Sequence, residues 1–229
     1  MKFIELHKWE VSVAEAAEIQ RTLKSRVSLE DGFRDLNLIA GVDMSISKAS
    51  HQGHAAVVVL SFPDLNLVEV RQATRILQFP YVPGFLSFRE SPVILQAFLA
   101  IEHIPDVVIV DGHGIAHPRG FGIASHLGVL LDIPTIGCAK SHLYGVYEEP
   151  GPERGSSTPL FDLDGRRIGN VVRTRTSVKP VFVSPGHKIS FDSAVKIVLD
   201  CAPRHRLPEP IRVAHRFAAE KAGVSTLAV

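Results

Sequence analysis

The spacing of apolar residues in the first third of the chain predicts one helix followed by three strands. Ser12 and Glu15 have the spacing of a capping box, and an approximate apolar stripe follows them, which predicts a helix over 12–26. β-Branched runs at 38–43 and 55–60 and an alternating segment at 65–76 predict three strands. Because the connections between these strands are short, we expect an antiparallel meander.

The centre of the chain alternates between strand and helix patterns. The segment 79–92 carries three prolines and a glycine and is expected to be a rigid aromatic loop, with Ser91 and Pro92 starting a helix. The continuous apolar run 106–111 is typical of a strand buried on both faces. Patterns for a helix and a short strand complete a predicted βαβ unit, at 120–131 and 134–137.

The last third of the chain predicts a loop, two strands and two helices. Gly, Pro, Ser and Glu are frequent over 145–159, strand patterns resume at 167–175 and 180–184, and helix patterns cover 190–201 and 209–223. We find no internal repeat. The order of elements predicts an α/β fold with a ribonuclease H-like mixed sheet, in which an antiparallel three-strand meander is followed by parallel strands and helices cover both faces.

Composition narrows the class of protein. Of the 229 residues, 45% are hydrophobic and 21% are charged, which is typical of a globular chain, and we expect one domain over residues 1–229. The amino terminus is too charged for a secretory signal, and no apolar stretch approaches the ~20 residues of a membrane helix. These features predict a soluble, cytoplasmic protein without a membrane partner. The two cysteines, Cys138 and Cys201, are too few for a zinc ribbon or a disulfide scaffold.

Positive charge is concentrated in one part of the chain. The formal net charge is only +1, but residues 164–216 contain eleven Lys or Arg and four Asp or Glu, a net of +7, which leaves −6 for the remainder. This separation suits a protein that holds a metal in one region and a phosphate backbone in another. Solvated faces on ordinary helices would give the same distribution, so charge alone leaves both interpretations open.

Two aspartates lie in apolar segments, where an ionised carboxylate is costly unless a cation or hydrogen bonds stabilise it. Asp43 is embedded in an apolar strand pattern, and Asp111 ends the run 106–111. If the two strands are neighbours, these carboxylates converge, and Glu90 can supply a third oxygen ligand. An all-oxygen set suits Mg²⁺ or Mn²⁺ rather than zinc. The alternative is that each acid caps its own turn.

Lys140 and His215 are the cationic candidates near such a metal. Lys140 follows a short strand, where an ammonium can pair with a scissile phosphate. His215 falls on the last predicted helix, where an imidazole can transfer a proton of the attacking water or of the leaving group. A surface lysine and a core or surface histidine are the ordinary alternatives.

Other catalytic motifs have little support. His113 and His117 have the i, i+4 spacing of a zinc protease, but the glutamate is missing and the segment is hostile to a helix. The glycines of 112–122 lack the spacing of a dinucleotide-binding loop, no P-loop is present, and Ser184 is not in a nucleophile elbow. These glycines can instead let the backbone approach a flat ligand closely.

Five motifs occur in a fixed order along nearly the whole chain. They are Gly41–Asp43, Pro80–Glu90, Asp111–Gly122, Ala124–Gly128 and Gly137–Ser141. Together they resemble the endonuclease V (deoxyinosine 3′-endonuclease) family. The resemblance implies a ribonuclease H-like fold and a Mg²⁺-dependent endodeoxyribonuclease of DNA repair, with Mn²⁺ as a substitute. The implied reaction is hydrolysis of the second phosphodiester bond 3′ to a hypoxanthine nucleotide, which leaves a 3′-hydroxyl and a 5′-phosphate.

The resemblance also implies roles for single residues. The metal-binding acids of the family fall on Asp43, Glu90 and Asp111, and these acids are catalytic together with Lys140 and His215. We expect the flipped base to enter a pocket whose backbone N–H groups face O6 of hypoxanthine and which leaves no room at C2. The resemblance implies that Tyr81 is the wedge that separates the two DNA strands. The expected substrate-binding residues are Pro80, Tyr81, Val82, Pro83, Gly84, Leu86, Gly112, His117, Gly122, Ile123 and Gly137.

The expected partner is inosine-containing DNA, single- or double-stranded, with RNA as a further possibility, bound by a monomer. The alternative is a ribonuclease H-like nuclease that acts on inosine-containing RNA or on other DNA structures, and it would share the acids and the fold. Only the wedge loop and the glycine-rich pocket argue against a nuclease for other nucleic-acid structures. A non-catalytic nucleic-acid-binding module would keep the basic part of the chain. It would have no need of Asp43, Glu90, Asp111 and Lys140 together.

Overall fold

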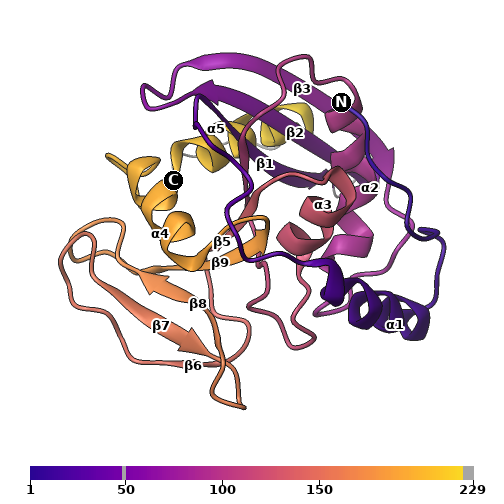
Figure 1. Cartoon of the computed structure of the whole chain (residues 1–229). Coiled ribbons are helices and arrows are strands. Elements are labelled where there is room, and N and C mark those ends of the chain that lie inside the picture. The colour runs from indigo at the N-terminus through magenta and orange to yellow at the C-terminus, as the bar shows by residue number, and fades with distance from the viewer. Residues whose placement is uncertain (48–49, 224–229) are drawn as a thin grey trace.

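A nine-stranded mixed sheet forms the centre of the computed structural model, which describes residues 1–47 and 50–223 (Figure 1). The strand order is β3-β2-β1-β4-β5-β9-β8-β7-β6. The strands are β1 (Leu38–Ser47), β2 (Gln52–Ser61), β3 (Leu67–Ile76), β4 (Val107–Val110), β5 (Thr135–Ala139), β6 (Val146–Tyr147), β7 (Ser157–Phe161), β8 (Arg167–Val172) and β9 (Val181–His187). The helices are α1 (Val13–Leu23), the short 3-10 helix η1 (Lys24–Arg26), α2 (Leu86–Leu99), α3 (Ile123–Leu131), α4 (Phe191–Asp200) and α5 (Glu209–Lys221).

The pairing of the strands confirms the predicted meander and the parallel strands after it. β1 pairs antiparallel with β2, and β2 pairs antiparallel with β3. β4 then lies parallel to β1, and β5 lies parallel to β4. β9 returns antiparallel to β5, and β8, β7 and β6 continue in antiparallel pairs.

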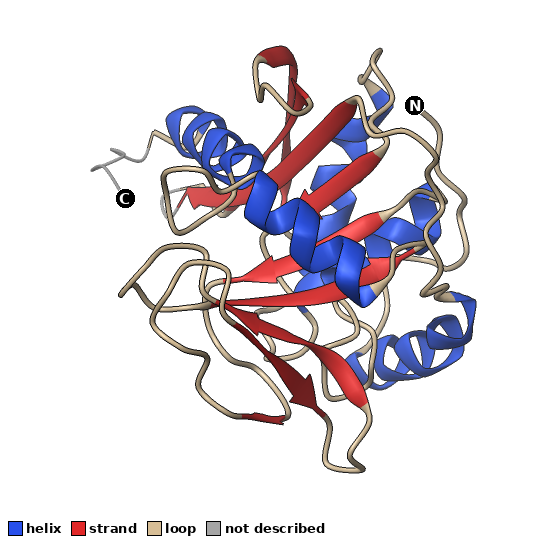
Figure 2. Ribbon diagram, turned by 60° about the vertical axis from the view of Figure 1, so that its left-hand side comes forward, coloured by secondary structure: helices blue, strands red, loops and turns tan. Residues whose placement is uncertain are grey.

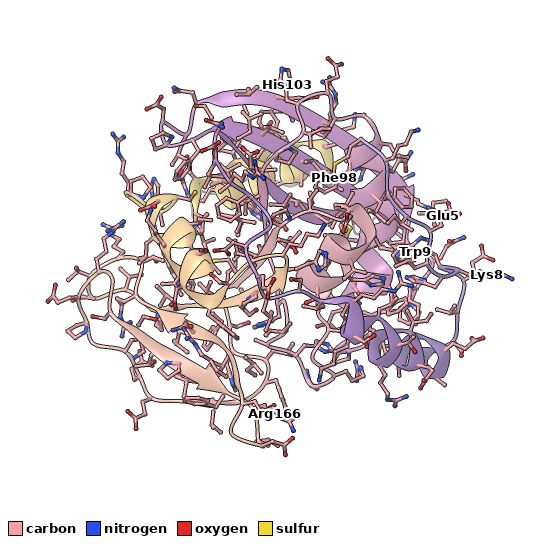
Figure 3. The ribbon with its side chains drawn as sticks, in the orientation of Figure 1. Glu5, Lys8, Trp9, Phe98, His103 and Arg166 are labelled. Carbon is pink, nitrogen blue, oxygen red and sulfur yellow. The ribbon has the colours of Figure 1, made fainter. Side chains whose placement is uncertain are left out.

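Helices cover both faces of the sheet, as the sequence predicts. α2 and α3 enclose one apolar cluster, in which Phe98 is 1% exposed and lies between α2 and the sheet (Figure 3). α4 and α5 enclose the cluster on the other face, and Figure 2 shows the sheet between the two helix layers. Among the described residues, no helix is both long and apolar enough to cross a membrane.

Helix α2 begins earlier than the sequence predicts. The predicted start at Ser91 and Pro92 is wrong, because the helix begins at Leu86 and Pro92 lies in its second turn. Proline inside a helix costs about 3 kcal/mol, since it removes a backbone hydrogen bond. Phe88 is 1% exposed in an aromatic cluster beneath this first part of the helix, and its burial offsets that cost. As a result, Glu90 is held by a helix and not by a loop.

The predicted loop over 145–159 is also wrong in part, because it contains β6 and the beginning of β7. Both residues of β6 are exposed, and only Leu160 of β7 is buried, so these strands carry no alternation of apolar and polar positions. β6, β7 and β8 project beyond the helices, and Arg166 marks the tip of the turn between β7 and β8 (Figures 1 and 3). We refer to these three strands as the projecting lobe.

Candidate active site

Alternation along the strands brings the predicted acids to one face of the sheet. In β1, Ile39 packs toward α4 and α5, whereas Val42 packs toward α2 and α3. Asp43 therefore shares the face of Ile39, since residues two apart point the same way. The parallel register pairs Val42 with Val110, so Asp111, which follows Val110, lies beside Asp43 where the pairing ends.

Each aspartate is bound by one basic side chain. Nδ1 of His215 donates a hydrogen bond of 2.6 Å to Oδ2 of Asp43. Nζ of Lys140 lies 2.6 Å from Oδ2 of Asp111. His215 reaches the sheet because α5 packs directly on Gly41, where a Cβ atom would overlap the backbone of α5. The structure thus brings four of the five predicted catalytic residues into two adjacent pairs.

Burial and mutual repulsion perturb the pKa values of the cluster. Burial, and then the charges of Asp43 and Asp111, raise the pKa of Glu90 well above its usual range. Burial and the charge of Asp43 also raise the pKa of Asp111, against the lowering effect of Lys140. Burial alone would lower the pKa of Lys140, but its contact with Asp111 raises it. The hydrogen bond to Asp43 raises the pKa of His215.

The donor set of these acids fits a hard divalent cation. Asp43, Glu90 and Asp111 offer only oxygen atoms, and their mutual repulsion is the interaction that a divalent cation would relieve. Within residues 1–47 and 50–223, no three His, Cys, Asp or Glu side chains form a ready-made metal cage. The assignment of the metal to these three acids therefore stays a prediction.

Arg206 holds the backbone that carries Lys140, and sequence reasoning missed it. Its Nη2 donates to the carbonyl of Lys140 at 2.5 Å and to the carbonyl of Pro180 at 2.9 Å. Its Nε donates to the carbonyl of Lys179 at 2.8 Å. Arg206 lies in the irregular segment between α4 and α5, where no motif or periodicity marks it.

A pocket of about 260 Å³ begins where the cluster ends, since Gly112 follows Asp111 and Ser141 follows Lys140. We refer to it as the base pocket. Nine of the predicted substrate-binding residues line it, namely Tyr81, Val82, Pro83, Gly84, Leu86, Gly112, His117, Gly122 and Ile123. The sequence did not single out its other lining residues as substrate-binding, which are Gln20, Ser87, His113, Ser141, His142 and Leu143.

Pro80 and Gly137 do not line the base pocket. Pro80 is exposed at the start of the loop that carries Tyr81. Gly137 lies in β5 beneath the segment 112–114, and a Cβ atom there would meet the backbone of that segment. Gly137 therefore supports the wall of the pocket from below. Ser141, His142 and Leu143 directly follow Lys140 in the sequence. Their position next to a predicted catalytic residue is the feature of the sequence that could have identified them.

The carbonyl of Gly84 fixes the loop between β3 and α2. It accepts hydrogen bonds from Nε2 of Gln20 at 3.1 Å, Nε2 of His117 at 2.9 Å and Nη2 of Arg119 at 2.6 Å. Nδ1 of His117 accepts the backbone N–H of Arg119 at 3.2 Å, so both ring nitrogens are used within the protein. Burial and the charge of Arg119 lower the pKa of His117 to about 4. His117 is therefore neutral at neutral pH and positions the loop.

Tyr81 is presented to solvent by this loop. Its side chain is 75% exposed, which excludes a tyrosine packed in the core between its prolines. Gly84 has a φ of 79°, a backbone conformation that favours glycine, and the loop turns there into α2. The loop therefore holds an aromatic ring outside the protein at the mouth of the base pocket.

Comparisons with known proteins agree with this arrangement. The model of the endonuclease V family matches residues 21–216. Endonuclease V of Nostoc punctiforme is 49% identical over 222 residues, which cover 96% of this chain and 100% of that protein. The crystal structure of endonuclease V from Streptomyces avermitilis matches with a TM-score of 0.89 and 40% identity, covering 94% of this chain and 95% of that chain.

A further solved structure contains a nucleic acid. Endonuclease V of Ciona intestinalis, in complex with a 24mer DNA containing an inosine followed by a ribo-adenosine, matches with a TM-score of 0.82 and 30% identity. The match covers 92% of this chain and 97% of that chain. These likenesses, together with the meander and the parallel strands after it, show that the fold is ribonuclease H-like. The chain belongs to the endonuclease V family.

Proposed function

We propose that the protein is a metal-dependent endodeoxyribonuclease of DNA repair that recognises deoxyinosine. It hydrolyses the second phosphodiester bond 3′ to the inosine and leaves a 3′-hydroxyl and a 5′-phosphate. The observation that carries this proposal is the cluster of Asp43, Glu90, Asp111 and Lys140 directly beside the base pocket. The chain would act as a monomer with one catalytic domain, on single- or double-stranded DNA.

The acids and the cations of the cluster have separate tasks. Asp43, Glu90 and Asp111 would hold Mg²⁺, or Mn²⁺ in its place, which supplies activation of a water molecule and stabilisation of charge on the phosphate. Lys140 places an ammonium beside Asp111, where it can face the negative charge that grows on the scissile phosphate. Asp43 binds Nδ1 of His215 and so leaves Nε2 to move a proton.

The base pocket offers backbone donors to a flipped purine. α2 begins at Leu86 without a side-chain cap, so the backbone N–H groups of Leu86 and Ser87, which both line the pocket, would be available to O6 of hypoxanthine. Gly112 lies against Ile123, which leaves little space for an exocyclic amine such as that of guanine. Flipping costs less for a base whose pairing is already weak, as for deaminated adenine opposite thymine.

A cleavage gel tests the proposed function. A labelled strand with one inosine is incubated with Mg²⁺, and matched strands carry adenine or guanine at the same position. We expect cleavage of the inosine strand alone, at the second phosphodiester bond on its 3′ side, and none in EDTA. Equal cleavage of all three strands, or cleavage in EDTA, would contradict the proposal.

Replacement of Lys140 by alanine is expected to slow the chemical step about a hundredfold to a thousandfold, since this is the usual cost of losing one preorganised donor in the transition state. His215→Ala should have a smaller effect. Single-turnover rates at saturating protein measure both. Lys179→Ala is the matched control, because it removes an exposed lysine of the same basic region without touching the cluster. An unchanged rate in Lys140→Ala would remove this lysine from the mechanism.

Tyr81→Ala is expected to weaken binding to an inosine-containing duplex about tenfold, because an aromatic face replaces stacking worth ~1–3 kcal/mol per base. Tyr81→Phe should bind as the parent does. The measurement is the Kd for the duplex in the absence of divalent cations, with thermal unfolding as the control for folding. A Tyr81→Ala protein with the parental Kd would show that Tyr81 is not a wedge.

A further inference from the structure

A second aromatic cluster adjoins the base pocket. The ring centroids of His142, Tyr147 and Phe182 lie 5.4, 5.5 and 5.4 Å apart in their three pairs. His142 lines the base pocket, and Tyr147 lines a separate open groove of about 490 Å³. One group of packed rings therefore lies between the two cavities and contributes to the wall of each.

The groove runs over the first two strands of the projecting lobe. It is lined by Val146, Tyr147, Glu148, Thr158, Pro159 and Phe161. Val146 is 55% exposed and Tyr147 is 37% exposed, so their apolar surface is open to solvent. The carboxylate of Glu148 would repel a phosphate, whereas an apolar surface with an exposed ring suits the face of a base.

The groove and the catalytic cluster lie in different directions from the base pocket. Asp43 lies in β1 and Asp111 directly follows β4, and both of these strands lie on one side of β5 in the sheet. The projecting lobe lies on the other side of β5. The proposed cleavage is 3′ to the inosine, so the nucleotides on that side lead toward Asp43 and Asp111. A strand that continues past the flipped base would then carry its 5′ nucleotides toward His142, which lines the pocket, and the projecting lobe.

We propose that the groove beside Tyr147 is a subsite for the base of a nucleotide on the 5′ side of the inosine, which stacks on the Tyr147 ring. This inference rests on the proposed function, because it takes the direction of the strand from the position of cleavage. The subsite would accept any of the bases, since every base has a π face and no hydrogen-bonding code is needed. The packing of Tyr147 on Phe182 holds the ring in place before the strand binds.

Binding of short strands in EDTA tests this subsite. All strands share the inosine and its 3′ part. One begins at the inosine, one carries several 5′ nucleotides, and one carries the same 5′ backbone without bases. We expect wild type to bind the strand with 5′ bases about tenfold more tightly than the other two. Tyr147→Ala should lose this advantage and bind the strand that begins at the inosine with the parental Kd.

Two variants separate stacking from packing. Tyr147→Phe keeps the aromatic face and should keep the tenfold advantage, whereas Tyr147→Leu keeps an apolar contact with Phe182 and should lose it. Leu163→Ala is the matched control, because Leu163 is 74% exposed in the turn between β7 and β8 but does not line the groove. If Tyr147→Ala still binds the strand with 5′ bases about tenfold more tightly than the other two strands, the proposed subsite is wrong. If wild type neither binds nor cleaves inosine strands selectively, the proposed function fails instead.

Discussion

Replacement of Asp43 or Asp111 by alanine is expected to reduce inosine-directed cleavage by more than about a thousandfold. Binding of a divalent cation in the active site is worth several kcal/mol to a phosphodiester hydrolysis, and each ~1.4 kcal/mol corresponds to a factor of ten in rate. Both carboxylates belong to the set proposed to hold this cation. The Kd for the inosine-containing strand should change much less, because the base pocket is lined by other residues.

Single-turnover cleavage in Mg²⁺, Kd and thermal unfolding are measured on the same preparations. Asp106→Ala is a matched control, because Asp106 lies at the other end of β4 and accepts the backbone N–H groups of Asn37 and Leu38. We expect this variant to unfold at a lower temperature and to cleave at the parental rate. A folded Asp43→Ala or Asp111→Ala protein that cleaves near the parental rate would show that the acids are not metal ligands.

The apolar patterns of the sequence predict the part of the fold that carries the acids. Residues two apart in a strand share a face, and a run that is apolar on both faces, such as 106–111, is typical of a central parallel strand. These two rules together place Asp43 beside Asp111 once β1 and β4 pair, as they do in the structure. The helix layers on both faces follow from the same pattern.

Other features could not be derived from local sequence, because distant contacts decide them. The start of α2 depends on the burial of Phe88, which outweighs a helix-breaking Pro92. Gln20 reaches the base pocket from α1 through its bonds to Gly84 and Phe121, and no spacing in the sequence connects these segments. The exposed strands of the projecting lobe bury too little to produce a periodic pattern.

Gly112→Val is expected to reduce inosine cleavage by at least about a hundredfold while the protein stays folded. A Cβ atom on Gly112 would lie 2.5 Å from Cγ2 of Ile123, and both residues line the base pocket. The larger side chain would occupy the space for the base, and a misplacement of about 1 Å is enough to cost a hundredfold in rate. Gly112→Ala should show a smaller loss because it adds one carbon atom.

The cause of the loss can be separated from damage to the metal site. Cleavage, divalent-cation binding and thermal unfolding are measured together. Gly112→Val should unfold at a lower temperature, because any side chain at a φ of 159° is strained and its Cβ would press on Ile123, but it should still fold and bind the cation while cleavage is lost. A Cβ atom on Gly112 would meet only atoms of Ile123 within 4 Å. Removing most of the Ile123 side chain should relieve this contact, so the double variant Gly112→Ala with Ile123→Ala should bind inosine strands more tightly than Gly112→Ala alone. Ile123 is 3% exposed, so this double variant should also lose about 2–5 kcal/mol of stability. A folded, cation-binding Gly112→Val protein that cleaves inosine strands normally would contradict the base pocket, since hypoxanthine would then have to be recognised elsewhere.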